Sequence, residues 1–209
     1  MNNNFSKKDQ NQKYLFRVFF LCYNFFMNKK ENLIWIDTEF TGLDFENNQL
    51  LEIALVVTDK NLNILDKGLE IIIHQDDDIL DNMNEWCTIN FKKSGLTEKS
   101  RNSKISLEDA EKIILEYLEK YTEKGQNPIC GNSVGHDRRV LFKFMKKFED
   151  EWASYRTIDV SSIKELVKRW NSKILEDVKK IKKGNHRAMD DVLESIEELK
   201  VYREKFIKE

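Results

Sequence analysis

Little proline or glycine interrupts this 209-residue chain, which contains one proline, Pro128, and seven glycines. It has no Ser/Gly/Pro-rich linker and no internal repeat, so neither a second domain nor a solenoid is indicated. Its 35 basic and 37 acidic residues nearly cancel, and a net charge of −2 argues against a protein that coats long nucleic acid. A protein that binds only a few nucleotides needs few cations and is not excluded.

Cysteine is also scarce, and the three cysteines, Cys22, Cys87 and Cys130, have no C-x-x-C spacing. This removes the usual zinc-ligand pattern and predicts reduced, buried thiols in a compartment of the cytosolic type.

No apolar run is long enough to cross a bilayer, because the longest, residues 14–27, is short and contains Arg17. No small-residue cleavage site follows it, so a secretory signal is not indicated. A mitochondrial presequence is one alternative, and a true start at Met27 is the other. We therefore expect an N-terminal extension, residues 1–30, and one domain, residues 31–209. That domain should be cytoplasmic, or mitochondrial if residues 1–26 are a presequence, and should not associate with membranes.

Strand patterns come first along the chain, and helices then alternate with short strands. The near-continuous apolar run 33–37 predicts a central strand covered on both faces. Further strands are expected at 51–58, 64–74, 128–131 and 157–160. Helices are expected within 76–91, from Ser106, and near 137–148, 161–170 and 186–206. This order predicts an α/β domain with a mixed five-stranded sheet flanked by helices.

Two acids, Asp37 and Glu39, fall at the end of the predicted central strand. Side chains two apart on a strand project from the same face, so both carboxylates can serve one cation or a pair. The alternative is a solvated turn beyond the strand, and a D-x-E motif by itself does not decide between them.

Two further segments carry candidate residues at predicted helix starts. Asp137 follows a Gly-rich turn, where an acid can also simply interact with the helix dipole. His186 and Asp191 are five apart, which is about 140° around one continuous helix. They can therefore act together only if His186 precedes the helix or lies in its first turn. A surface or capping histidine is the alternative.

Taken together, four acids and one histidine come from one strand end and two helix starts. Convergent carboxylates favour hard divalent ions with oxygen ligands, chiefly Mg²⁺ or Mn²⁺. The sequence thus predicts a metal site formed by Asp37, Glu39, Asp137 and Asp191.

The words around these acids resemble the motifs of the DEDD exonuclease superfamily. NLIWIDTEFTGL, residues 32–43, resembles the first motif, and Asp137 in GNSVGHDRR resembles the second. His186-x-Ala188-x-x-Asp191 resembles the third in its histidine-bearing form. The segments PICGNSVGHDRR, IDVSSIKELVKRW and YREKFIKE are similar to the oligoribonuclease family in particular. The similarity covers about residues 32–209.

The resemblance implies an RNase H-like fold, a homodimer, and removal of mononucleotides from the 3′ end of very short single-stranded RNA. It implies two metal ions, with His186 as general base and Tyr155 as a second catalytic residue. It also implies that Leu43 and Trp86 stack on bases, and that Tyr155, Ser133, Arg156 and Ser161 close over the 5′ phosphate, some of them from the partner subunit.

Several alternatives to these assignments stay open at this stage. Leu43 and Trp86 could be core residues, Ser161 a helix cap and Tyr155 an ordinary packing residue. Phe91 stands where the family often has a histidine, which could alter substrate contact. A DNA-directed exonuclease, a nuclease fold that serves only as a scaffold, and a purely structural α/β protein are the rival functions.

Overall fold

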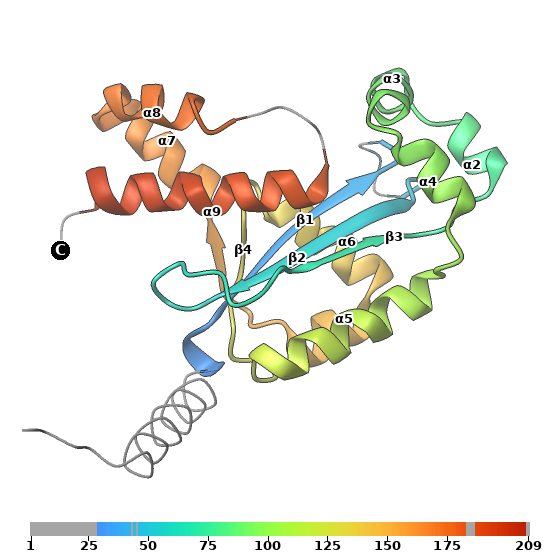
Figure 1. Ribbon diagram of the computed structural model, residues 1–209, viewed down its shortest axis with the longest axis horizontal. Coiled ribbons are helices and arrows are strands. Elements are labelled where there is room, and N and C mark those ends of the chain that lie inside the picture. The colour runs from blue at the N-terminus through green and yellow to red at the C-terminus, as the bar shows by residue number, and fades with distance from the viewer. Residues whose placement is uncertain (1–28, 43, 45, 183–186, 208–209) are drawn as a thin grey trace, which may run out of the picture.

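The computed structural model describes residues 29–42, 44, 46–182 and 187–207, which form a single sheet with helices on both faces (Figure 1). The strand order is β3-β2-β1-β4-β5. The strands are β1 (Leu33–Phe40), β2 (Leu50–Thr58), β3 (Leu69–Ile72), β4 (Ile129–Gly131) and β5 (Thr157–Asp159). The first three pair antiparallel, whereas β4 pairs parallel to both β1 and β5. The mixed five-stranded sheet is therefore confirmed.

β1 is the central strand, and its alternating side chains supply both halves of the core. Ile34 and Ile36 pack on the face covered by α5 (Leu107–Tyr121) and α6 (Gly135–Phe144). Trp35 packs on the other face, with residues of α7 (Val160–Trp170) and α9 (Ala188–Lys205). Figure 1 shows α9 lying across the sheet on the side opposite α5. Odd-numbered residues of β1 thus face α9, and even-numbered ones face α6.

Shorter helices complete the two layers and one end of the sheet. α2 (Asp77–Asp81), α3 (Glu85–Ser94) and α4 (Leu96–Asn102) gather there around a small core of their own (Figure 1). The remaining short elements are η1 (Lys29–Glu31), η2 (Phe148–Trp152), η3 (Ser172–Ile174) and α8 (Leu175–Lys179).

Some boundaries differ from those expected. The third strand covers only Leu69–Ile72, and Ile64 makes an isolated bridge with Thr58. The Asp66 side chain accepts a hydrogen bond from the Gly68 N–H, and Gly68 has a φ of +75°, so a turn separates the two pieces. α6 ends at Phe144 rather than near 148, and α9 begins at Ala188 rather than at 186.

Helix α5 begins as expected, because the Ser106 side chain accepts a hydrogen bond from the Asp109 N–H at 3.1 Å. The cap of α7 was expected at Ser161 and is instead Asp159, whose carboxylate accepts from the Ser161 N–H at 2.8 Å. Among the described residues, none of the helices combines the length and apolar character needed to span a bilayer. Residues 1–28 lie outside the described part, and the boundary expected at residues 30–31 stays a prediction.

Candidate active site

Three carboxylates converge where the end of β1 meets the first turn of α9. Asp37, Glu39 and Asp191 offer oxygens that all lie within 4.8 Å of one another. The alternation of β1 explains the meeting, since Asp37 and Glu39 are on the face of the sheet that α9 covers. All three are partly buried, so the solvated-turn alternative for the D-x-E motif is wrong.

The fourth acid, Asp137, adjoins this cluster from the opposite layer. It lies in the first turn of α6 and is almost fully buried. Thr38, which points to the α6 face of β1, donates a hydrogen bond from Oγ1 to Asp137 Oδ1 at 2.7 Å. Asp137 is thus fixed beside Asp37, and it is not a surface acid that interacts only with the helix dipole.

The clustering makes full ionisation of the four acids unfavourable. Burial and the charges of Asp137, Glu39 and Asp191 raise the pKa of Asp37 well above its ordinary value. Burial, then Asp191, raises the pKa of Glu39 to about 8. Burial also raises the pKa of Asp137 to about 7, although the Thr38 hydrogen bond opposes it. A divalent cation with oxygen ligands would compensate this charge, so the donor set fits a metal such as Mg²⁺ or Mn²⁺.

The general base expected at position 186 lies outside the described residues. Its neighbour Arg187 is described and adopts an extended backbone, with φ −130° and ψ 128°, just before α9. Helix α9 begins at Ala188, and Asp191 falls in its first turn. The pairing of His186 with Asp191 stays a prediction.

Trp86 lies on α3 and is 51% exposed, so it is not a core residue. Its ring meets that of Phe91 edge to face, with centroids 6.1 Å apart. Phe91, where the family often has a histidine, is fully buried in the small core under α3. In this chain it therefore supports Trp86 from beneath. Leu43 lies outside the described residues.

Ser133 and Ser161 lie side by side, as the resemblance implies. Their hydroxyls are 3.1 Å apart, and Ser161 also donates to Asn132 Oδ1 at 3.1 Å. The carboxylate of Asp159 accepts from both backbone N–H groups, of Ser133 at 3.1 Å and of Ser161 at 2.8 Å. Ser133 has a φ of +52°, so this loop is held in a conformation that costs energy unless contacts maintain it.

Tyr155 and Arg156 lie on the surface between η2 and β5. Tyr155 is 77% exposed, and the Arg156 guanidinium carbon lies 4.4 Å from the centre of its ring. Tyr155 is therefore not a core residue of this subunit, and its contact with Arg156 leaves surface packing open.

Sequence reasoning missed several residues that shape the site, chiefly Thr38, Glu52 and Asn132. Glu52 left a signal, since it is the one charged residue in the apolar strand run LLEIALVVT. A charge in a strand buried on both faces needs a partner. Asn132 and Thr38 are uncharged, and their sequence surroundings do not distinguish them.

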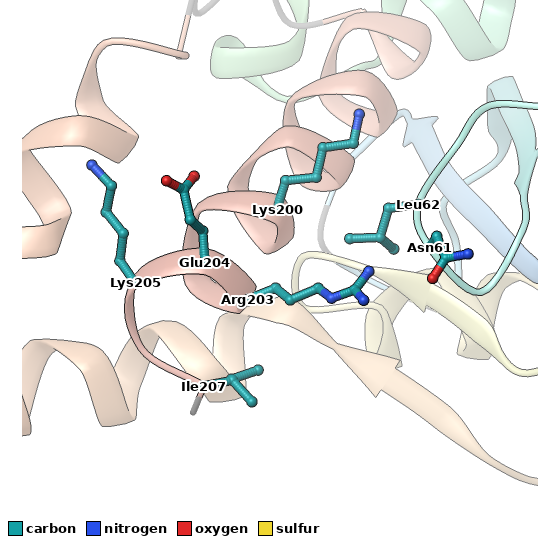
Figure 2. Close-up of a pocket in the computed structure, with 7 residues that line it drawn as sticks. All are labelled: Asn61, Leu62, Lys200, Arg203, Glu204, Lys205 and Ile207. Atoms are coloured by element: carbon teal, nitrogen blue, oxygen red, sulfur yellow. The ribbon is translucent and has the colours of Figure 1, made fainter. Parts of the chain in front are cut away.

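A hollow of about 610 Å³ lies at the other end of α9, away from Asp191 (Figure 2). Lys200, Arg203 and Lys205 line it beside Asn61 and Leu62. Lys200 pairs with Glu197, and Lys205 pairs with Asp177 at 2.6 Å. The hollow, at the C-terminal end of α9, is separate from the carboxylate cluster at the other end.

The fold agrees with comparisons to known proteins. Residues 34–199 match the exonuclease family described as RNase_T. Solved structures of exonuclease I are similar in fold. The one from Methylocaldum szegediense has a TM-score of 0.63 at 17% identity over 84% of this chain. An E. coli complex with a dA16 oligonucleotide has a TM-score of 0.67 at 14% identity, also over 84%. In each case this chain spans 41% of the other chain's length. The class of protein is therefore an exonuclease.

Curated relatives narrow the class. An oligoribonuclease of Pseudoalteromonas atlantica is 52% identical over 69% of this chain and 80% of its own length. One of Colwellia psychrerythraea is 51% identical over 85% and 96%, respectively. A probable oligoribonuclease of Dictyostelium discoideum is 52% identical over 68% and 74%. The chain therefore belongs to the oligoribonuclease family of exonucleases.

Proposed function

We propose that this protein removes mononucleotides from the 3′ end of very short single-stranded RNA by metal-dependent hydrolysis. The observation that carries the proposal is the convergence of Asp37, Glu39 and Asp191 within 4.8 Å at the end of the central strand. The family membership supplies the substrate class, since the relatives at about half identity are oligoribonucleases.

The four acids together form the metal site in this proposal. Asp37, Glu39 and Asp191 hold two divalent ions, Mg²⁺ or Mn²⁺, and Asp137 completes the site. When bound, such ions activate water and stabilise the leaving 3′ oxygen. His186 accepts a proton from the attacking water, whose oxygen bonds to phosphorus as the P–O3′ bond breaks. An imidazole suits this role because it changes protonation near neutral pH.

The substrate contacts follow from the exposed residues around the acids. Trp86 and Leu43 stack against the 3′-terminal bases, and Trp86 has the exposure that such a contact requires. Ser133, Ser161 and Arg156 bind the 5′ phosphate of a short substrate. A pocket closed at both ends of a dinucleotide explains a preference for very short RNA.

A homodimer is part of the proposal, because Tyr155 points into solvent in one subunit. A hollow of about 780 Å³ lies between it and Phe142, which is 67% exposed. Arg138 and Arg139 line the same hollow. We assign this surface to a second copy of the chain, whose Tyr155 completes the neighbouring active site. We also propose that residues 31–209 form the catalytic unit and act in the cytoplasm, or in mitochondria if residues 1–26 are a presequence.

The test compares 5′-labelled RNA dinucleotide, a ten-nucleotide RNA and a DNA dinucleotide, each with Mg²⁺, with Mn²⁺ and with EDTA. The RNA dinucleotide should be cleaved fastest, and EDTA should abolish cleavage. The Asp191→Asn variant, which removes one ligand charge, should be inactive while it remains folded. Equal rates on the two RNA lengths would contradict the proposal of a closed pocket. A preference for DNA would support a DNA-directed exonuclease. If no metal-dependent hydrolysis were detected, the protein would be a scaffold or a purely structural protein.

A further inference from the structure

Glu52 of β2 is a fully buried carboxylate on the strand that pairs with β1. Its Cα partner across the β1–β2 pair is that of Glu39. A buried charge in this place is costly unless a cation meets it with good geometry. Glu52 therefore has a partner that the fold must bring to it.

That partner is Arg187, at the start of α9. The Arg187 guanidinium donates from Nε to Glu52 Oε1 at 3.1 Å and Oε2 at 3.0 Å, and from Nη2 to Oε1 at 2.6 Å. The Ala188 N–H adds a weaker bond to Glu52 Oε2 at 3.4 Å. This fork-shaped pairing fixes the orientation of Arg187 as well as its charge. Arg187 also pairs with the partly exposed Glu70.

A second ion pair lies at Lys182, whose side chain is more exposed than that of Arg187, and Lys164 shares its partner Glu198. The Lys182 ammonium group is 3.2 Å from Glu198 Oε2 and 3.5 Å from Glu194 Oε2. Both glutamates are on α9, and their side chains are 0% and 6% exposed, respectively. Glu198 is held further by Tyr202, whose hydroxyl donates to Oε1 at 2.7 Å, and by Asn132 at 3.2 Å.

These two cations flank the general base in the sequence. Arg187 follows His186 directly, and Lys182 precedes it by four residues. One peptide bond joins Arg187 to His186, and adjacent Cα atoms are about 3.8 Å apart. Misplacing a proton acceptor by about 1 Å costs on the order of 100-fold in rate, so both ends of the segment need firm attachment.

We propose that Arg187 and Lys182 are positioning residues for His186, each anchored to buried glutamate. Glu52 holds one end of the segment, and Glu198 with Glu194 holds the other. The inference rests on the proposed function, because it gives these residues a role only if His186 takes the proton.

The first experiment measures kcat and KM on RNA dinucleotide for Arg187→Met and Lys182→Met. Each variant should lower kcat roughly 10- to 100-fold, with KM and the metal requirement nearly unchanged. Two matched controls remove partners that are exposed. Lys180→Met breaks a surface pair with Asp177, and Glu70→Gln removes the exposed partner of Arg187. Both controls should keep the wild-type kcat, and an unchanged kcat in both Met variants would overturn the inference.

Arg187→Met leaves Glu52 buried without its counter-charge and could fail to fold. The double variant Glu52→Gln/Arg187→Met removes both charges, and such replacements are often tolerated. If it unfolds at the wild-type temperature, its kcat should still fall. A stable double variant with normal kcat would contradict the proposal.

A double-mutant cycle with His186→Ala then separates positioning from any other effect. If Arg187 and Lys182 act through His186, their loss should change kcat less than about twofold in the His186→Ala background. An undiminished effect there would overturn the inference. The chain has only three histidines, so the imidazole NMR signal that disappears in His186→Ala identifies residue 186. That signal should shift or broaden in the Met variants and stay unchanged in Lys180→Met.

The same variants distinguish a failure of the proposed function from a failure of the positioning role alone. A wild-type protein without metal-dependent RNA hydrolysis, or a His186→Ala variant with near-normal kcat, would overturn the proposed function and the inference with it. Normal wild-type behaviour, an impaired His186→Ala variant and unaffected Met variants would overturn the inference alone.

Discussion

Glu39 links the geometry of the carboxylate cluster to the pH behaviour of the metal-free protein. Burial and the charges of Asp191 and Glu52 raise its pKa from 4.5 to about 8. A carboxyl group with a higher pKa in the folded than in the unfolded chain binds extra protons when folded. Its contribution to stability is therefore complete below about pH 4.5 and is lost as the pH rises through about 8.

We expect the melting temperature in EDTA to fall by on the order of 5 °C between pH 5 and pH 8.5. Mg²⁺ or Mn²⁺ should restore it, and most strongly at the alkaline end, where the carboxylates are ionised. Calorimetry across this range, with and without metal, measures both effects. Glu39→Gln should flatten the EDTA curve because it cannot ionise. A melting temperature that rises with pH in EDTA would contradict the assignment.

The individual residues differ in how far sequence reveals them. Strand alternation places Asp37 and Glu39 on one face of β1. Their meeting with Asp191 was expected from the family resemblance, because no local pattern connects β1 with α9. Glu52 could have been suspected as a charge in an apolar strand, but its partner is 135 residues away. Thr38 and Asn132 gain their importance only from the layer that packs against them, which no local pattern encodes.

At the scale of elements, Asp159 joins two parts of the fold that are distant in sequence. It caps α7 through the Ser161 N–H and also binds the Ser133 N–H in the loop before α6. The sequence suggested Ser161 as the cap, because a serine before a helical pattern is a common start signal. The structure uses the acid two residues earlier, and the Ser161 hydroxyl remains directed to Asn132 and Ser133.

Asp159→Ala should therefore lower both stability and substrate affinity. Loss of the cap should cost about 1–2 kcal/mol of unfolding free energy. The loop of Ser133 should lose its anchor, which raises KM for RNA with a 5′ phosphate more than KM for RNA without one. Urea unfolding and steady-state kinetics on the two substrates measure these effects.

Ser106→Ala is the matched control, since Ser106 caps α5. It should lose similar stability and keep the wild-type KM. If both variants change KM equally, Asp159 has no particular connection with the phosphate site.

The third strand is shorter than its sequence pattern predicted. Its β-rich pattern began at residue 64, yet continuous pairing with β2 is limited to Leu69–Ile72. The strand begins only at Leu69 because Asp66 stabilises a turn at Gly68, whose backbone is left-handed. The glycine was a local turn signal, but the apolar pattern around it favoured a continuous strand. The central strand was easier to predict, because burial on both faces leaves a near-continuous apolar run.

At the scale of the whole molecule, the proposed dimer predicts that two defective subunits can restore each other. Tyr155→Ala should lower activity because each site lacks the partner's tyrosine, and Asp191→Asn should abolish it by removing a metal ligand. Co-expression of the two variants should recover roughly a quarter of wild-type activity, since half of the dimers are mixed and each has one complete site. The purified mixed dimer, isolated through two different tags, should have about half the activity of the wild-type dimer, and its assay measures the recovery.

The control is co-expression of Tyr155→Ala with itself under both tags, which should stay at the level of the single variant. A mixed dimer no more active than that control would place Tyr155 outside the neighbouring site. A molar mass of one subunit, measured by light scattering, would contradict the proposed dimer.

Three of the four proposed metal ligands, Asp37, Glu39 and Asp191, come from β1 and α9, so the proposed metal site forms only after these two elements have docked. A ribosome releases the β1 segment long before α9 has been synthesised. Asp37 and Glu39 then lack Asp191, and the emerging polypeptide cannot gather the charges that attract a cation. The nascent chain should therefore not hydrolyse even short RNA, and nuclease activity should begin only when α9 docks on the sheet.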